Sequence, residues 1–239
     1  MKIALIGYGK MGHAIEEIAL QRGHEIVLKV GIENIQDNTI EQIKKADVAI
    51  EFTGPEVAFD NVIRCFDAGV PVVSGSTDWL QRFEEATTYC NKKNGTMLYA
   101  SNFSVGVNIF FAINKRLAEL MAPHKEYDVK LKEIHHTQKK DAPSGTAISL
   151  ANDMMQELTS KTKWVNHKSD NPAELIILSR REDEVVGIHT VEYVSAADKI
   201  EIRHEAFSRA GFARGAILAA EWIVGKKGMY AFPEILNQI

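Results

Sequence analysis

The chain has 239 residues, of which 45% are hydrophobic and 25% are charged, and its formal net charge is −4. These values are typical of a globular protein, exclude a disordered or fibrous chain, and argue against a general nucleic-acid binder. The apolar N-terminal stretch is too short for a signal peptide and no run approaches a membrane span, so we expect no membrane partner. The spacing of Cys65 and Cys90 fits neither a disulfide framework nor a zinc site, so we expect no metal and a cytoplasmic location.

Short apolar runs alternate with longer amphipathic runs over residues 1–100, which is the pattern of a parallel sheet joined by crossover helices. The expected strands are Ile3–Ile6, Ile26–Val30, Val48–Phe52, Val72–Ser74 and Met97–Ala100. The expected helices are Met11–Arg22, Glu56–Ala68 and Gln81–Asn94, with Gly23, Gly69 and Gly95 at their C-caps. The fold class is therefore α/β, with a Rossmann-like doubly wound parallel sheet.

The pattern changes after a further expected helix at Val107–Met121. One clear helix, from Ser144 to about Leu158, accompanies four strand-like stretches, Tyr127–His136, Leu175–Ser179, Val185–Val194 and Ile200–Ala206. This composition predicts a second, smaller α+β domain. The charged run Ser179–Glu184 is expected to form a solvated hairpin.

The final helical run, Ala213–Val224, has a broad apolar face and is expected to return to the first domain. We therefore expect residues 1–105 and 213–239 to form the first domain and residues 106–212 the second. The segments Asn102–Gly106 and Ala210–Gly215 are the expected crossings between them.

A glycine-rich motif lies between the first expected strand and the first expected helix. It consists of Gly7, Tyr8, Gly9, Lys10, Met11 and Gly12, in the spacing G-x-G-x-x-G. In this position, glycines allow a tight turn, close approach of a pyrophosphate and close helix packing, while the helix N-terminus offers unpaired N–H groups. The motif predicts a dinucleotide site, and a glycine-rich turn without a ligand is the less favoured alternative.

Glu33 follows the second strand about twenty residues later, where an acid would bind the adenosine ribose hydroxyls. Its carboxylate repels a 2′-phosphate whereas Lys10 attracts one, so both NADH and NADPH are candidate cofactors. Two more segments follow the fourth and fifth strands, where open α/β sheets bind ligands. They are Gly75, Ser76 and Thr77, and Ala100, Ser101, Asn102 and Phe103, which we include as candidate cofactor-binding residues, although each segment taken alone is more often a turn with small residues than a binding loop.

Reactive side chains cluster in the tract E-I-H-H-T-Q-K-K-D-A-P-S-G-T-A, from Glu133 to Ala147. His135 and His136 would point to opposite faces of a regular strand, so they can serve one site only if the strand ends there. The polar stretch that follows, with Lys139, supports such an end. Single histidines are usually structural, but two beside a lysine indicate a functional role for at least one.

The tract ends in an expected helix N-terminus, with Ser144 as the N-cap. Free N–H groups at Gly145 and Thr146, with the Thr146 hydroxyl, would bind a carboxylate. We therefore expect the helix start, Ser144, Gly145 and Thr146, to bind the substrate. A well-capped helix without a ligand would explain Ser144 but not the histidines and the lysine.

The tract, as E-x-H-H-x-x-K-x-D-A-P-S-G-T-A, resembles the signature of the 4-hydroxy-tetrahydrodipicolinate reductase (dihydrodipicolinate reductase) family of diaminopimelate and lysine biosynthesis. Further segments resemble the family in the same order: Gly7–Gly12, Phe52–Thr53, Gly75–Thr77, Asn102–Asn108, Val186–His189 and Ile200–Arg209. The resemblance thus spans nearly the whole chain.

The resemblance implies hydride transfer from NADH or NADPH to C4 of a small dicarboxylate ring, with loss of the 4-hydroxyl as water. It implies that His135 is the proton donor/acceptor, that Lys139 is a proton donor, and that His136, Gly145 and Thr146 bind the substrate. It also implies that the first domain binds the dinucleotide and that the second binds substrate and forms a homotetramer. No metal is needed.

Asn34 departs from the family pattern, because it replaces a basic contact to the 2′-phosphate, and it argues against a strong NADPH preference. Two other readings compete with the reductase. Another two-domain amino-acid-pathway dehydrogenase would share the glycine motif but lack the tract from Glu133 to Ala147. An NAD(P)-binding paralogue without turnover would keep both.

Overall fold

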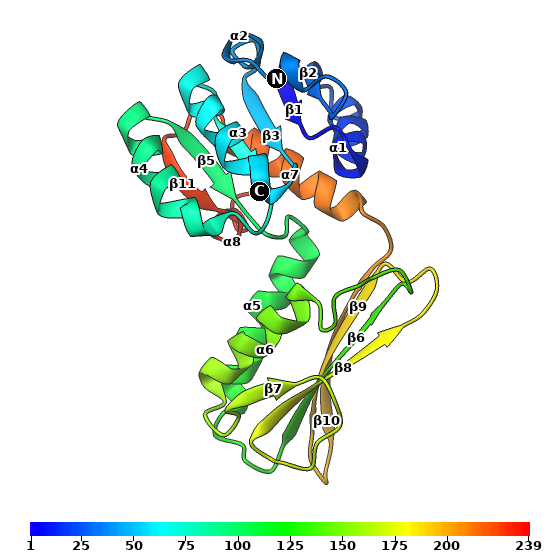
Figure 1. Cartoon of the computed structure of the whole chain (residues 1–239). Coiled ribbons are helices and arrows are strands. Elements are labelled where there is room, and N and C mark those ends of the chain that lie inside the picture. The colour runs from blue at the N-terminus through cyan, green and yellow to red at the C-terminus, as the bar shows by residue number, and fades with distance from the viewer. The chain divides into compact units, whose positions relative to one another are not determined.

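The computed structural model describes all residues from Met1 to Ile239 and divides into two compact units (Figure 1). Unit 1 consists of Met1–Val105 and Arg209–Ile239, and unit 2 of Gly106–Ser208. The chain returns to unit 1 just before helix α7 (Ala210–Ile223). The chain thus crosses between Ser208 and Arg209, directly before the segment Ala210–Gly215 near which the crossing was expected, and these six residues form the first turns of that helix. No helix is long and apolar enough to cross a membrane.

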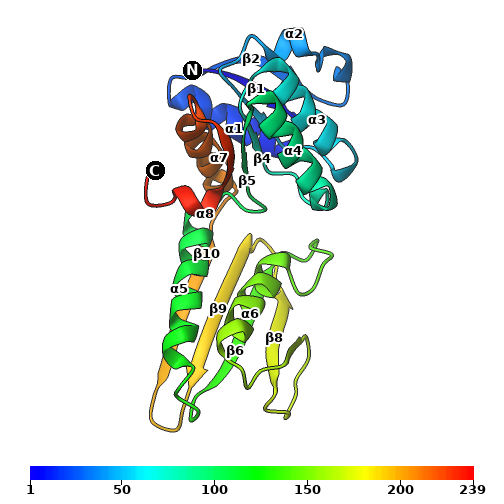
Figure 2. The ribbon, with the colours of Figure 1, turned by 90° about the vertical axis from the view of Figure 1, so that its left-hand side faces the viewer.

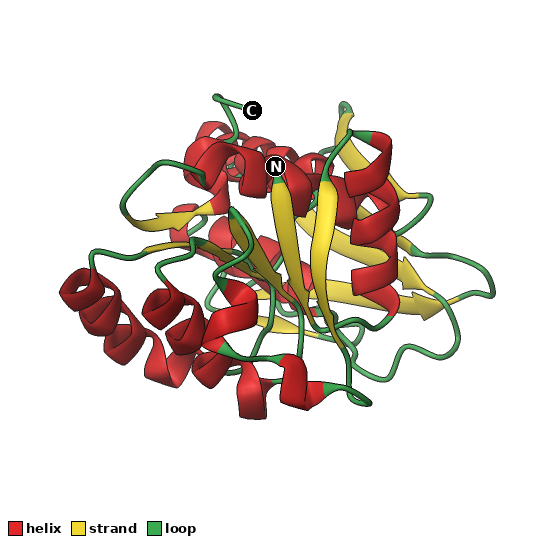
Figure 3. Cartoon of the chain, turned by 90° about the horizontal axis from the view of Figure 1, so that it is seen from above, coloured by secondary structure: helices red, strands yellow, loops and turns green.

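The core of unit 1 is a six-stranded parallel sheet with the order β11-β5-β4-β3-β1-β2, which confirms the doubly wound prediction. Figure 3 shows the chain from above, with helices in red and strands in yellow. Its strands are β1 (Lys2–Ile6), β2 (Glu25–Val30), β3 (Val48–Glu51), β4 (Val72–Ser74), β5 (Thr96–Tyr99) and β11 (Gly228–Ala231). The central strands β1, β3 and β4 are buried on both faces because helices cover both faces of the sheet.

Two hydrophobic cores lie on opposite faces of this sheet. Helices α1 (Lys10–Gln21) and α7 pack on one face, while α3 (Pro55–Ala68) and α4 (Phe83–Lys93) pack on the other. The remaining helical elements are short: η1 (Ile35–Asp37), α2 (Ile40–Ile43), η2 (Leu80–Arg82) and α8 (Phe232–Ile235). Strand β11 and helix α8 were not predicted, since each has only four residues.

Glycines end two of the helices as predicted. Gly23 has φ +78° and Gly69 has φ +71°, both in the left-handed region that favours glycine. After α4, however, Asn94 rather than Gly95 takes this conformation, with φ +49°. Asparagine tolerates the left-handed region better than most residues, so the cap falls one position earlier than predicted.

Unit 2 is a five-stranded sheet with the order β10-β9-β6-β8-β7, with helices α5 (Val105–Met121) and α6 (Gly145–Glu157) on one face (Figure 2). The strands are β6 (Asp128–His135), β7 (Lys163–Val165), β8 (Glu174–Arg181), β9 (Gly187–Val194) and β10 (Lys199–Ala206). In β6 burial alternates from residue to residue, because one face packs against the helices and the other does not.

The expected hairpin at Ser179–Glu184 is wrong. Strand β6 lies between β8 and β9, pairing parallel with β8 and antiparallel with β9. The charged run therefore contains the end of β8, whose last residue, Arg181, pairs with His135 of β6. Strand β7 was also missed, because it has only three residues.

Candidate active site

The glycine motif forms the turn between β1 and α1. Gly7 has φ +103°, and a Cβ there would lie 2.0 Å from the Phe52 carbonyl oxygen. A Cβ on Gly12 would lie 2.6 Å from the Gly7 carbonyl oxygen, so the helix start also requires glycine. A Cβ on Gly9 would meet no atom within 4 Å. The turn is thus closed on the protein side and open at Gly9, which fits the approach of a pyrophosphate.

Helix α1 begins at this opening without a side-chain cap or an acidic residue in its first turn. Lys10 and Met11 lie in that turn, so their N–H groups are available to an anion. Next to the turn is a pocket of about 780 Å³ that Gly7, Tyr8, Gly9 and Glu33 line. The residues present in unit 1 therefore fit a dinucleotide.

Sequence reasoning missed several polar residues of this pocket, among them Asn38, Thr53, Asp60, Asn61 and Arg64. They come from β2–α2 and β3–α3 connections and from α3, and no short motif marks them. Asn61 links them, since its Oδ1 accepts from Asn38 Nδ2 at 2.7 Å and from Arg64 Nη1 at 3.2 Å.

The side chains around Glu33 are mostly engaged with the protein. The Tyr8 hydroxyl donates a hydrogen bond to the Glu16 carboxylate, which also accepts a hydrogen bond from the Lys29 ammonium at 3.0 Å. The Asn34 amide accepts from Gly31 N at 2.7 Å and donates to the Lys29 carbonyl at 2.8 Å. Asn34 therefore holds the loop that presents Glu33, and Lys29 is paired away from the exposed Glu33 carboxylate.

Glu51, at the end of β3, is fully buried and was not predicted as a site residue. Its carboxylate accepts from the Ser74 and Ser76 hydroxyls at 2.7 and 2.8 Å, and from both the backbone N–H and the hydroxyl of Thr53. Burial raises the pKa of Glu51, opposed by these donors. Thr53 lines the dinucleotide pocket, so Glu51 ties that pocket to the loop after β4.

The segments after β4 and β5 lie at the carboxyl edge of the sheet, as predicted, but outside the lining of the pocket. In Gly75–Thr77, Ser76 is buried and bonds to Glu51, whereas Thr77 is exposed. In Ala100–Phe103, the Asn102 side chain accepts from Ser104 N at 2.8 Å. Phe103 is 1% exposed and packs on Phe232, which indicates a core role for its ring.

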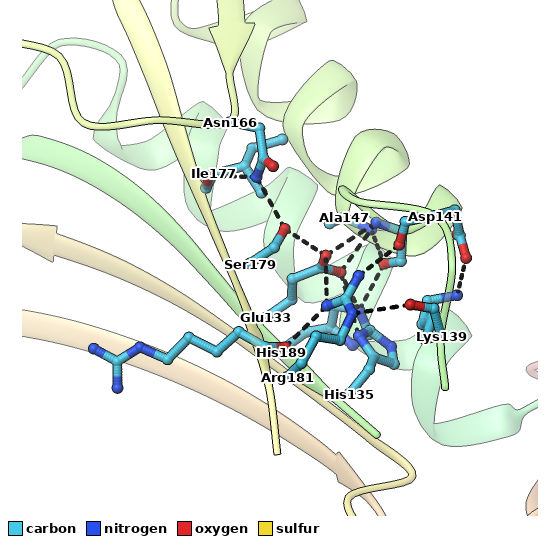
Figure 4. A network of polar contacts seen from close by, with 12 residues as sticks. Glu133, His135, Lys139, Asp141, Ala147, Asn166, Ile177, Ser179, Arg181 and His189 are labelled. Atoms are coloured by element: carbon cyan, nitrogen blue, oxygen red, sulfur yellow. Dashed lines mark hydrogen bonds and ion pairs between the residues drawn. The ribbon is translucent and has the colours of Figure 1, made fainter. Parts of the chain in front are cut away.

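In unit 2, β6 ends at His135, which is the strand end that the histidine pair required. His135 is 7% exposed. Its Nδ1 lies 3.5 Å from a Glu133 carboxylate oxygen, and this nitrogen has no hydrogen-bond partner. His189 of β9 approaches the same oxygen to 3.7 Å, and its ring centroid lies 5.1 Å from that of His135 (Figure 4). Glu133 also accepts from the Ser179 hydroxyl at 2.6 Å.

The environment of this cluster determines the charges of His135 and Glu133. Burial, with repulsion from His189, lowers the pKa of His135 to about 4. Burial raises the pKa of Glu133, but contacts from His189, Ser144 and Ser179 outweigh it and bring the pKa to about 2. Near neutral pH, His135 is therefore neutral and Glu133 is ionised.

Sequence reasoning placed Glu133 in the reactive tract but gave it no role, and it did not place His189 in this cluster. Their side chains meet because β6 and β9 pair with Glu133 opposite His189. The carboxylate and imidazole atoms of Glu133, His135 and His189 lie within 4.8 Å of one another, a donor set that a divalent cation could use. The absence of a metal remains a prediction.

Lys139 lies in the loop between β6 and α6, with its ammonium 2.8 Å from an Asp141 carboxylate oxygen. Hydrogen bonding to Lys139 lowers the pKa of Asp141. Helix α6 begins at Gly145, and Ser144 is its N-cap, accepting from Ala147 N at 3.2 Å. Ser144 is buried, with its own N–H directed to Glu133 and its hydroxyl 3.2 Å from His189.

Gly145 and Thr146 are the first two residues of α6, and their backbone N–H groups have no acceptor within the protein. A Cβ on Gly145 would meet no atom within 4 Å, so space is open above the helix start. His136, just after the strand, is half-buried. Unit 2 thus brings together His135, Lys139 and the helix start, with Ser144 turned into the protein.

Comparisons with known proteins identify the family of this chain. The family descriptions "Dihydrodipicolinate reductase, N-terminus" and "Dihydrodipicolinate reductase, C-terminus" match residues 1–103 and 106–236. The chain belongs to the dihydrodipicolinate reductase family. Its predicted membership is thereby confirmed, and with it the assignment to NADH- or NADPH-dependent oxidoreductases.

A relative from Christiangramia forsetii, named 4-hydroxy-tetrahydrodipicolinate reductase, is 46% identical, and the match covers 100% of this chain and 99% of the relative. One from Neisseria gonorrhoeae with the same name is 33% identical, covering 93% of this chain and 84% of the relative. A solved dihydrodipicolinate reductase from Paenisporosarcina, with dipicolinate bound, matches with a TM-score of 0.75 over 100% of this chain and 99% of that one. At 21% identity, this last likeness shows the fold.

Proposed function

We propose that this member of the dihydrodipicolinate reductase family reduces 4-hydroxy-tetrahydrodipicolinate to tetrahydrodipicolinate with NADH or NADPH. The observation that carries the proposal is the grouping of His135, Lys139 and an open helix N-terminus at the end of β6. Two relatives bear the name of this activity, and the Paenisporosarcina enzyme holds the planar dicarboxylate dipicolinate.

The dinucleotide contacts belong to unit 1. We assign the pyrophosphate to the open turn at Gly9 and to the first turn of α1, and the adenosine ribose to Glu33. When bound, the reduced nicotinamide supplies the hydride for C4 of the substrate. The remaining chemistry belongs to side chains of unit 2.

We assign the substrate carboxylates to Gly145, Thr146 and His136. The N–H groups at the start of α6 combine directed donors with the positive end of the helix dipole, and both favour an anion. Ser144 supports this site from the protein side, because its hydroxyl caps the helix and its N–H is held by Glu133.

The overall reduction consumes one proton as hydride reaches C4 and the 4-hydroxyl leaves as water. Lys139 is suited to supply it, since its ammonium lies in the loop beside the helix start. His135 is neutral near neutral pH, so before substrate binds it acts as an acceptor. A bound dicarboxylate would favour its protonated form, which makes it a donor as well.

The homotetramer that the resemblance implies would use unit 2. Helices α5 and α6 cover one face of its sheet, while the opposite face has no helix (Figure 2). That face presents Lys132 paired with Glu192 at 2.7 Å, together with half-buried Leu178. We propose this face as the subunit contact, which a measured molar mass in solution would test.

The activity is tested by a coupled assay that supplies fresh 4-hydroxy-tetrahydrodipicolinate and follows oxidation of NADH and NADPH separately. We expect both to be oxidised, without strong preference for NADPH, because Asn34 holds its own loop and Lys29 is paired with Glu16. Binding of NADH without oxidation of either cofactor would contradict the proposal and favour a non-catalytic binding protein.

A further inference from the structure

The loop from His136 to Asp141 carries Lys139 and contains no helix or strand. Its internal backbone hydrogen bond runs from Lys139 N to the His136 carbonyl at 3.1 Å. This single turn leaves the carbonyls of Lys139 and Asp141 without backbone donors. The position of the Lys139 side chain therefore depends on what holds these two carbonyls.

Arg181, the last residue of β8, supplies both donors (Figure 4). Its Nε donates to the Lys139 carbonyl at 3.2 Å, and its Nη2 donates to the Asp141 carbonyl at 2.6 Å. Its Nη1 donates to the Arg180 carbonyl at 2.9 Å and lies 3.9 Å from a Glu133 carboxylate oxygen. All three guanidinium nitrogens are thus directed at protein acceptors.

The strand pairing explains why this residue reaches the loop. Arg181 pairs with His135 across the parallel β6 and β8 strands, at the point where β6 ends and the loop begins. Side chains two apart along a strand share a face, so Arg181 lies on the same side of the sheet as Ser179, which bonds to Glu133.

We propose that Arg181 is a positioning residue that holds the loop of Lys139 in its reactive conformation. This inference rests on the proposed function, in which Lys139 supplies a proton. A guanidinium can donate along two directions in one plane, so it can bridge carbonyls two residues apart. A lysine ammonium is a point charge on a flexible chain and cannot reproduce both bonds in the same geometry.

The test compares Arg181→Ala and Arg181→Lys with Arg116→Ala, a control at an exposed arginine of α5. We expect Arg181→Ala to lower kcat by about 10- to 100-fold, Arg181→Lys to restore little of it, and Arg116→Ala to stay within about twofold of wild type. The KM for NADH should not change in any of the three. Wild-type kcat in Arg181→Ala would overturn the proposal.

A double-mutant cycle separates positioning from direct contact with the substrate. Binding of pyridine-2,6-dicarboxylate is measured calorimetrically in wild type, Arg181→Ala, Lys139→Ala and the double variant, each saturated with NADH. If Arg181 acts through Lys139, its removal weakens binding by about 10-fold in the wild-type background and by less than about twofold in the Lys139→Ala background. Equal losses in both backgrounds would overturn the proposal.

Hydrogen exchange gives a readout that does not depend on activity. Arg181→Ala should speed exchange of the Lys139 amide, which donates to the His136 carbonyl, while leaving the amides of β6 at the wild-type rate. A wild-type exchange rate of the Lys139 amide in Arg181→Ala would overturn the proposal. The proposed function fails separately, if the wild-type enzyme shows no turnover in the coupled assay while its Lys139 amide is protected.

Discussion

His135 lies at the end of a buried strand, between an ionised carboxylate and a second imidazole. Its Nδ1 is buried without a hydrogen-bond partner, an arrangement that costs stability unless a ligand or a proton completes it. Such a cost is common where a protein keeps a group available for chemistry. The environment of His135 therefore supports the proton-transfer role that we propose for it.

Replacing this imidazole tests that role. We expect His135→Gln to reduce kcat by about 100-fold or more, because glutamine cannot exchange a proton near neutral pH. The Kd for NADH should remain at the wild-type value, since the glycine motif lies in unit 1. Steady-state kinetics and a fluorescence titration of NADH measure the two effects. His124→Gln, at an exposed histidine, is the control. A wild-type kcat in His135→Gln would contradict the assignment of proton transfer to His135.

The residues of this cluster differ in how far sequence could predict them. His135, His136 and Lys139 lie within one tract, so their proximity was evident. Arg181 lies 42 residues after Lys139 and His189 lies farther along the chain, and only the pairing of β8 and β9 with β6 brings them there. The sequence pattern predicted that Arg181 lies in a solvated hairpin, because a charged run indicates exposure when the strand order is unknown.

At the level of elements, prediction succeeded where length and periodicity were strong. The long helices of unit 1, α1, α3, α4 and α7, and its first five strands follow the predicted order, since each contains a clear apolar run bounded by turn residues. It failed for β7 and β11, which have three and four residues and are stabilised by neighbouring strands rather than by local sequence. Strand order within unit 2 depends on tertiary packing, which no local pattern encodes.

Glu51 joins two elements of unit 1, because it receives hydrogen bonds from the connections after both β3 and β4. We expect Glu51→Gln to weaken NADH binding by about 5- to 10-fold, since an amide has one acceptor oxygen where the carboxylate has two. The affinity of unit 2 for pyridine-2,6-dicarboxylate in the absence of NADH should not change.

Calorimetric titration of each ligand measures this difference, and Glu41→Gln, at an exposed position in α2, is the matched control. Ser74→Ala is a milder variant that removes one donor to Glu51 and should weaken NADH binding less. If Glu51→Gln loses thermal stability while keeping its NADH affinity, the carboxylate has only a structural role.

At the scale of the whole molecule, the two units carry buried ionisable groups with opposite pKa shifts. In unit 2 the pKa of His135 is lowered from 6.5 to about 4, and that of Glu133 from 4.5 to about 2. The stability that His135 contributes is complete above pH 6.5 and is lost as the pH falls to about 4. The contribution of Glu133 is complete above pH 4.5 and is lost toward pH 2.

In unit 1 the pKa of Glu51 is raised, so the sign is reversed. Its folded state favours the protonated carboxyl, and that stabilisation is lost as the pH rises through the raised pKa. Lowering the pH therefore removes stability from unit 2, by about 3 kcal/mol for His135 alone, without the same loss from Glu51 in unit 1.

We accordingly expect acid unfolding of the full chain to begin in unit 2. Hydrogen exchange at pH 7 and pH 4.5, corrected for intrinsic rates, should show loss of protection in β6 and β9 before β1 and β3. His135→Gln removes the titrating group and should flatten the decline of β6 protection between these two values. Earlier loss of protection in β1 and β3 would contradict the argument, because it would mean that the buried histidine and carboxylate do not control acid stability.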